Sequence, residues 1–455
     1  MREGHCCKIS PVPLLSAILL LSTLAHAQTP VIRTEVRQVL VPVIVTDSKG
    51  HHVTGIKASD FHVFEDGVEQ EIAAFSTDTS PAPDVLAATN PAAPKSPSAP
   101  PGRTYVICID ALHTASADST RAREALAKLF EKEKASPGTR YVLLSIGEQL
   151  RVLQTATNDP AVVLATLRKA AIQPALGGGG AAALSSELNA LKQRMYDFCR
   201  RCAACGSTTN ARACEDQAQN LKLELDAQAE RWTQSRRGFL AQLKSAVEEL
   251  AKLPDGRTLI LVSDGFSLQP ARDFYAVVAA FLPGDSRFRT PGPADLDSEL
   301  TAILKIAVER NVQIYSVDAR GVGQSSFSSG GSMDASSPAD TSAPSVIRRG
   351  GGPSNRGGTL LSEMDHQASS VTLQNGSGME RLASSTGGVY LHDSNDLLKQ
   401  FRSALADGRE YYVLAYVPKD RTEDGKFRAI TVEVSDKKLR VRAKSGYWAE
   451  IVTEK

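Results

Sequence analysis

Four apolar, largely β-branched runs separated by helix-like segments dominate the middle of the chain. The runs are TYVICID (104–110), TRYVLLSIG (139–147), RTLILVSDG (257–265) and VQIYSVDA (312–319). Such runs are typical of strands buried on both faces. The segments between them repeat apolar residues at helical spacing, as in ADSTRAREALAKLFEKEKA. Strands separated by helices predict a doubly wound, mostly parallel sheet, and we assign this α/β domain to residues 103–408.

The two flanks of this domain alternate apolar and polar residues, which is typical of half-buried strands. Residues 31–76 predict strands at 36–46, 60–65 and 68–75, and residues 409–450 predict three more in EYYVLAYVP, KFRAITVEVS and KLRVRAKSGYWAE. Three short strands make a poor core on their own. We therefore predict one small six-stranded β-sandwich, with the α/β domain inserted between its two halves.

Three segments interrupt this pattern. Residues 77–102 are rich in Pro, Ala and Ser and predict an extended linker. Residues 185–237 predict a helical insertion that carries four cysteines. Residues 319–360 are rich in Gly and Ser and predict a disordered insertion. At helix starts, Asp159 before Pro160 predicts an N-cap, and Ser394 is the candidate N-cap of the last helix.

The first residues have the layout of a secretory signal peptide. A short basic opening, MREGHCCK, precedes the apolar run PVPLLSAILLLSTLA and the small-residue sequence AHA. The run is shorter than the roughly 20 residues that span a bilayer, and the residue directly after the predicted cleavage at Ala27 is Gln28 and not a cysteine. We expect residues 1–27 to be removed and the mature protein to be periplasmic or secreted, with no membrane span.

Charge narrows the choice of partner. The 52 basic and 51 acidic residues leave a formal net charge of +1. A balanced chain gives no reason to expect a nucleic acid or an anionic membrane as partner.

Two sequences that could suggest catalysis do not match the known motifs. GGGG at 177 lacks the Lys-Ser/Thr of a phosphate loop, and the serine of SDGFS does not lie between glycines. We expect a protein that is not an enzyme.

Two core strands end in aspartate, VICID at Asp110 and LILVSDG at Asp264, between flanks such as TDSKGHHVTGIKASDFHVFEDGVEQEI and GREYYVLAYVPKD. In these features the chain resembles the VWFA-related proteins found mainly in Acidobacteria, which carry a von Willebrand factor type A domain between β-rich flanks. The resemblance covers nearly the whole mature chain. It implies an exported protein that mediates adhesion or protein–protein interaction through a metal ion, with a partner that presents an acidic side chain.

Type A domains hold Mg²⁺ with Asp-x-Ser-x-Ser after the first strand, a Thr from a second loop and an Asp from a third. The resemblance implies that Asp110, Thr114 and Asp264 are the ligands here, in a degenerate site in which Leu112 replaces the middle Ser. The expected Thr loop, GGGGAAAL at 177–184, has no hydroxyl. Alternatively, the two aspartates only cap loops or helix N-termini. His113 is either solvent-facing or a ligand for a softer metal.

The cysteines of the helical insertion leave several chemistries open. Cys199, Cys202, Cys205 and Cys214 could form structural disulfides, a four-cysteine zinc site or a redox CxxC pair. For disulfides we predict either Cys199–Cys214 with Cys202–Cys205, or Cys205–Cys214 with Cys199–Cys202. A thiol- or metal-handling protein is therefore the alternative function. Cys108, within a core strand, is predicted to be a plain buried thiol.

Overall fold

The computed structural model describes nine stretches of the chain, and the predicted signal peptide, most of the linker and most of the Gly/Ser-rich insertion lie outside them. The described residues are 38–77, 102–136, 138–169, 180–203, 211–253, 256–282, 288, 294–322 and 376–450. All of them belong to one compact unit, Gln38–Lys455. No helix within these stretches is both long and apolar enough to cross a membrane.

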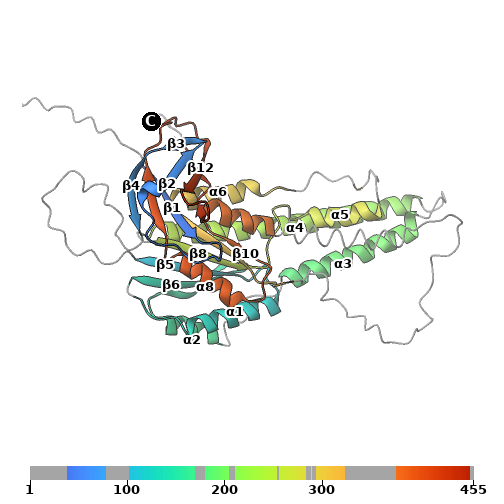
Figure 1. Ribbon diagram of the computed structural model, residues 1–455. Coiled ribbons are helices and arrows are strands. Elements are labelled where there is room, and N and C mark those ends of the chain that lie inside the picture. The colour runs from blue at the N-terminus through green and yellow to red at the C-terminus, as the bar shows by residue number, and fades with distance from the viewer. Residues whose placement is uncertain are drawn as a thin grey trace, which may run out of the picture. The chain divides into compact units, whose positions relative to one another are not determined.

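A six-stranded sheet forms the centre of the described fold, in the order β10-β9-β8-β5-β6-β7 (Figure 1). Its strands are β5 (Arg103–Asp110), β6 (Thr139–Ile146), β7 (Leu150–Thr157), β8 (Gly256–Ser263), β9 (Val312–Asp318) and β10 (Tyr390–Leu391). All neighbours pair in parallel except β6 and β7, which form an antiparallel hairpin at one edge. The predicted α/β fold with a mostly parallel sheet is confirmed.

Helices cover both faces of this sheet, because the core strands are apolar on both sides. Alternate β5 residues point to opposite faces, so Tyr105 and Ile107 join one apolar cluster and Cys108 the other. The first cluster includes α1 (Ser116–Phe130), α2 (Pro160–Arg168) and α8 (Leu397–Asp407); the second includes α4 (Ala211–Ala251), α6 (Asp297–Glu309) and a helix at 376–386. Cys108 is fully buried, and burial raises the pKa of its thiol.

Both flanks contribute strands to two small antiparallel sheets that share one apolar core. The sheet orders are β13-β1-β11-β4 and β14-β12-β2-β3. The N-terminal flank supplies β1 (Val39–Thr46), β2 (Phe61–Glu65), β3 (Val68–Gln70) and β4 (Ile72–Thr77). The C-terminal flank supplies β11 (Tyr412–Tyr416), β12 (Phe427–Val434), β13 (Arg440–Ala443) and β14 (Gly446–Trp448). The central sheet is therefore inserted between two interleaved halves of the sandwich.

The sandwich has eight strands in the described residues, so the predicted count of six is wrong. The run predicted as one strand at 68–75 divides into β3 and β4, which belong to different sheets with only Glu71 between them. The last predicted strand divides in the same way into β13 and β14. A chain that crosses from one sheet to the other within one or two residues keeps an unbroken alternation, and so the sequence shows no boundary.

The two predicted helix caps have different outcomes. Oδ1 of Asp159 accepts a 2.8 Å hydrogen bond from Ala161 N, as predicted for the N-cap of α2. The N-cap of α8 is Asp396, whose Oδ1 accepts from Lys399 N at 2.9 Å, so the assignment to Ser394 is wrong. The Ser394 hydroxyl instead accepts from Asp396 N at 3.2 Å and supports the residue that caps the helix.

The predicted helical insertion is a helix pair built from α3 (Gly180–Phe198) and the first half of α4, which runs through residue 237 without a break. A short π-helical turn, Cys199–Ala203, follows α3, and α5 (Arg272–Phe281) packs on the pair. Glu187 on α3 ties the pair together, because its Oε2 accepts from Trp232 Nε1 at 2.6 Å and from Gln228 Nε2 at 2.8 Å.

Candidate functional site

Three aspartates lie where neighbouring parallel strands end, at one edge of the central sheet. Asp110 ends β5, Asp264 directly follows β8, and Asp318 ends β9. Ile109 pairs with Val262 and Ser263 with Asp318, so the three strand ends are adjacent. Ligands of open α/β sheets bind at such carboxyl ends, so this edge is the candidate site.

Asp110 is fully buried and hydrogen-bonded through both of its oxygens. Oδ1 accepts from the backbone N–H groups of Leu112 at 3.0 Å and His113 at 2.9 Å, and Oδ2 accepts from His113 Nδ1 at 2.7 Å and Ser263 Oγ at 2.6 Å. Burial alone would raise the pKa of Asp110, but these donors outweigh it and the pKa is lowered. A carboxylate has about four acceptor positions, so none is left here for direct metal coordination.

His113 lies in the core and is not solvent-facing, contrary to one of the two expectations for it. Its ring stands edge-on to Phe239, with the ring centroids 4.7 Å apart. Burial, with the Arg236 cation second, lowers the pKa of His113 to about 4. The neutral ring therefore donates Nδ1–H to Asp110, and its bare Nε2 has no hydrogen-bond partner. His113 is a positioning group for Asp110.

Leu112 supplies no oxygen at the position where the resemblance expects Ser. Its side chain packs against the apolar cluster beneath α4 and α6. The loop 177–184, where a Thr was expected, lies only partly in the described residues and its side chains lie outside them. The serine that the sheet edge does use is Ser263, which binds Asp110 from the neighbouring strand.

Thr114 and Asp264 differ from Asp110 because each has an unused buried oxygen. Thr114 is fully buried, and its Oγ1 has no hydrogen-bond partner. Asp264 Oδ2 accepts from Ala115 N at 2.7 Å, whereas Oδ1 is buried without a partner. Burial first, and then the neighbouring Asp118 carboxylate, raise the pKa of Asp264 well above its usual value.

Sequence reasoning missed two charged groups at this edge, Asp118 and the pair Asp318–Arg320. Asp118 is in the first turn of α1, and its Oδ1 accepts from Arg121 at 2.5 Å. Arg121 also donates to the backbone oxygens of Ala319 and Arg320. The position of Asp118, four residues after Thr114 at a helix start, is the sequence signal that would have placed it at this edge.

These donors fit Mg²⁺ at Thr114 and Asp264 but not at Asp110. Mg²⁺ prefers carboxylate and hydroxyl oxygens, binds through one or two carboxylates and keeps several waters. In the described part of the chain, no group of three or more His, Cys, Asp or Glu side chains is arranged to hold a metal ion. Asp110, Thr114 and Asp264 therefore lie close together at this edge, and their joint role as metal ligands stays a prediction.

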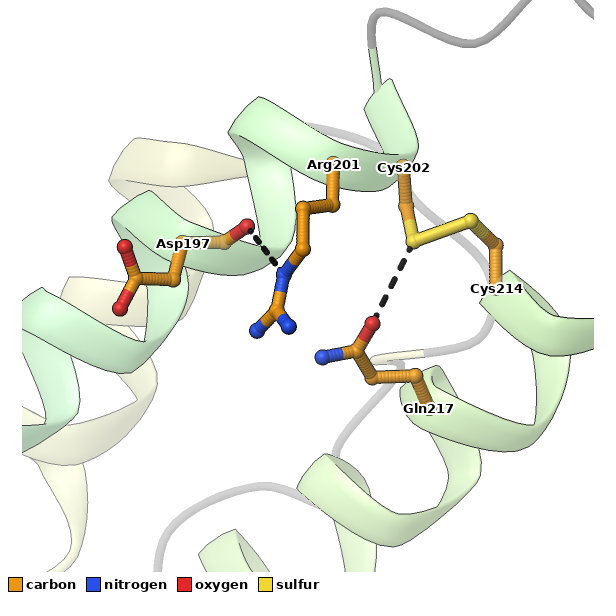
Figure 2. Close-up of a disulfide and its surroundings, with 5 residues drawn as sticks. All are labelled: Asp197, Arg201, Cys202, Cys214 and Gln217. Atoms are coloured by element: carbon orange, nitrogen blue, oxygen red, sulfur yellow. Dashed lines mark hydrogen bonds between the residues drawn. A yellow bond between two sulfur atoms is a disulfide. The ribbon is translucent and has the colours of Figure 1, made fainter. Parts of the chain in front are cut away.

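The predicted disulfide chemistry is present in this cluster, but the pairing differs from the predicted ones. Cys202 is bonded to Cys214, with the two Cα atoms 5.4 Å apart, and this bond joins the π-helical turn to the start of α4 (Figure 2). Neither predicted pairing contains Cys202–Cys214, so both are wrong. Cys199 Sγ lies 3.8 Å from the Phe281 backbone oxygen. Cys205 lies outside the described residues.

The disulfide also bears on the zinc interpretation of the cluster. A zinc site needs cysteine thiolates as ligands. The sulfurs of Cys202 and Cys214 are bonded to each other and are not available in that form. Arg201 and Gln217 flank the bond: Arg201 Nε donates to the Asp197 backbone oxygen at 3.2 Å, and Gln217 Oε1 lies 3.6 Å from Cys202 Sγ (Figure 2).

Comparison with known proteins gives no family. No protein-family model matches the chain, and no curated protein sequence matches it. Among solved structures, the chain is similar to BatB, a conserved hypothetical protein from Bacteroides thetaiotaomicron, with 10% identity, a TM-score of 0.29 and coverage of 68% of this chain and 98% of that one. An aerotolerance-related membrane protein from Bacteroides fragilis is also similar. It has 11% identity and a TM-score of 0.28, and the match covers 67% of this chain and 99% of that one.

A third similar structure is the PilB minor pilin from Streptococcus sanguinis, in its D319A form. It gives 9% identity, a TM-score of 0.28 and coverage of 68% of this chain and 62% of that one. TM-scores this low carry no argument about function. The fold therefore rests on the sheet order, and the function must be argued from the site.

Proposed function

We propose that this chain is a non-enzymatic, exported interaction protein that binds another protein at the carboxyl edge of its central sheet, with Mg²⁺ held at Thr114 and Asp264. The observation that carries the proposal is the pair of buried, unpartnered oxygens, Thr114 Oγ1 and Asp264 Oδ1. Leaving a buried polar group unsatisfied costs about 1–3 kcal/mol, and more when the group is charged. A bound cation removes that cost.

The surrounding groups support this division of roles. Asp110, His113 and Ser263 hold the loop after β5 in place, and Ala115 N holds Asp264 beside that loop. The protein thus builds a rigid edge with its first aspartate and keeps the oxygens of the other residues for a ligand. When bound, Mg²⁺ supplies an open coordination position that a carboxylate of the partner can take.

Calorimetric titration of Mg²⁺ into the purified mature protein tests the proposal. We expect saturable binding that is lost in Asp264→Asn, a variant that keeps an acceptor for Ala115 N but removes the charge. Asp159→Asn is the matched control, because Asn caps a helix as well as Asp does. Failure of the wild type to bind Mg²⁺ at millimolar concentration, or equal binding by Asp264→Asn, would refute the proposed site.

The thiol- or metal-handling alternative has less support. It requires reactive or ligating cysteine thiolates, and two of the four cysteines of the cluster are joined in a disulfide. The disulfide joins the π-helical turn Cys199–Ala203 to α4, in a helix pair fixed by the Glu187 hydrogen bonds. We therefore interpret the bond as structural.

A further inference from the structure

Two carboxyl groups, Asp118 and Asp264, lie close together at the sheet edge. Asp118 is in the first turn of α1, three residues after Ala115, whose N–H donates to Asp264 Oδ2, and the Asp118 carboxylate contributes to the raised pKa of Asp264. Both side chains are largely buried, with residue exposures of 7% and 8%. Like charges held this close repel one another, and a buried site screens them little. Such a pair needs a bound proton or a cation.

The nearby arginine is ion-paired with Asp118 only, and among the described residues no ion pair joins it to Asp264. Arg121 donates to Oδ1 of Asp118, and the same Nη2 also donates to the backbone oxygens of Ala319 and Arg320. Arg320 is bound to Asp318 through both carboxylate oxygens. Oδ1 of Asp264 remains buried without a partner in this charged environment.

The backbone explains why Asp118 stands beside Asp264. Ala115, which precedes α1, donates its N–H to Asp264 Oδ2 at 2.7 Å, so the start of the helix is fixed against the end of β8. Asp118 follows three residues later, on the first turn. Thr114, the neighbour of Ala115 on the other side, is fully buried with an unpartnered hydroxyl. One short segment thus carries Thr114 and Asp118 on either side of Ala115, whose N–H binds Asp264.

We propose that Asp118 is a ligand of the divalent cation together with Asp264 and Thr114, and that it supplies the oxygen lost where Leu112 stands in place of Ser. This inference rests on the proposed function, because it names a further ligand of the same site. The helix start favours a carboxylate at this position, since the N-terminal end of a helix carries partial positive charge. The ligand set is therefore shifted from the loop after β5 toward α1.

The test is Mg²⁺ titration of Asp118→Asn, beside the wild type and the control Asp159→Asn. Asparagine keeps an acceptor for Arg121 and removes the charge that faces Asp264. We expect the Mg²⁺ dissociation constant of Asp118→Asn to rise at least tenfold. We also expect its metal-free melting temperature to equal or exceed that of the wild type, because the repulsion is relieved.

The outcomes separate this inference from the proposed function. If Asp264→Asn abolishes Mg²⁺ binding while Asp118→Asn binds as the wild type does, the site stands and the role of Asp118 is refuted. If Asp118→Asn lowers the metal-free melting temperature and leaves the Mg²⁺ affinity unchanged, Asp118 only supports Arg121 and the inference is again refuted. If the wild type binds no Mg²⁺, both proposals fail.

Discussion

The hydroxyl of Ser263 donates a 2.6 Å hydrogen bond to Oδ2 of Asp110 and so ties the end of β8 to the end of β5. Together with His113, this bond commits the first aspartate of the site to holding the sheet edge in shape. An aspartate in the position of a metal ligand thus acts as a buried support. The consequence is that the roles of Asp110 and Asp264 can be separated by mutation.

Replacing Asp110 should act mainly on the stability of the fold and little on Mg²⁺ binding. Asp110→Ala leaves the ring of His113, the hydroxyl of Ser263 and two backbone N–H groups without their acceptor. We expect a loss of about 3 kcal/mol in the free energy of unfolding, and about 1 kcal/mol for Ser263→Ala. Urea denaturation measures both. A loss below about 0.5 kcal/mol for Asp110→Ala would contradict the supporting role.

Stability should depend on pH through His52, which lies next to β1. A 2.7 Å hydrogen bond to Asp407 on α8 is the main reason why the pKa of His52 is raised above its usual value. A base whose folded pKa is raised stabilises the fold fully below its unfolded pKa near 6.5 and loses this contribution as pH rises through the folded pKa. We expect stability to fall by about 1 kcal/mol between pH 6 and 8.5.

The free energy of unfolding is measured by denaturant titration of the wild type and His52→Gln, at about pH 6 and about pH 8.5. His52→Gln should remove the pH dependence assigned to this pair. His51→Gln is the matched control, because the side chain of His51 is 76% exposed. An equal pH dependence in the wild type and His52→Gln would show that other groups are responsible.

The stability of the sandwich should depend on one buried carboxylate that links strands from its two halves. Glu65 on β2 accepts from Tyr416 on β11 at 2.6 Å and from Tyr447 on β14 at 3.0 Å, and it is 3% exposed. Glu65→Ala leaves both buried hydroxyls without this acceptor, and we expect a loss of about 3 kcal/mol. The control Glu69→Ala, at an exposed position on β3, should lie within about 0.5 kcal/mol of the wild type. Similar stabilities for the two variants in thermal unfolding would contradict this role.

The disulfide can be mapped from a tryptic digest under non-reducing conditions. Cleavage after Arg201 and Arg212 places Cys202 in the peptide 202–212, and cleavage after Lys222 places Cys214 in the peptide 213–222. We expect these two peptides to be linked in the wild type and in Cys205→Ser. Linkage that disappears in Cys205→Ser, or linkage of Cys214 to the peptide 195–200 that contains Cys199, would contradict Cys202–Cys214.

The fold could be predicted from the sequence because its strongest signals are local. Buried parallel strands such as β5 and β8 are continuous apolar runs, and each weak flank needs the other to form a core. The number of sandwich strands could not be predicted, because the change of sheet at Glu71 has no turn signal. The caps show the same limit: Ser394 and Asp396 are both good N-cap residues, and only backbone geometry selects Asp396.

The site could be predicted only in part, because its chemistry depends on contacts between distant residues. Asp110 and Asp264 were correctly placed at strand ends, since the sequence shows where apolar runs stop. The saturation of Asp110 by Ser263, 153 positions away in the chain, has no local signal. The closeness of Asp118 to Asp264 likewise requires the bond from Ala115 N that fixes the start of α1.

A cation held by Thr114 and Asp264 is tested by the effect of Mg²⁺ on the melting temperature of Thr114→Val. Valine matches the shape of Thr114 and removes a hydroxyl that has no hydrogen-bond partner, so the metal-free variant should be at least as stable as the wild type. We predict that Mg²⁺ raises the melting temperature of the wild type and that Thr114→Val loses most of this rise. An equal rise in both proteins, or no rise in the wild type, would contradict a cation held by Thr114 and Asp264.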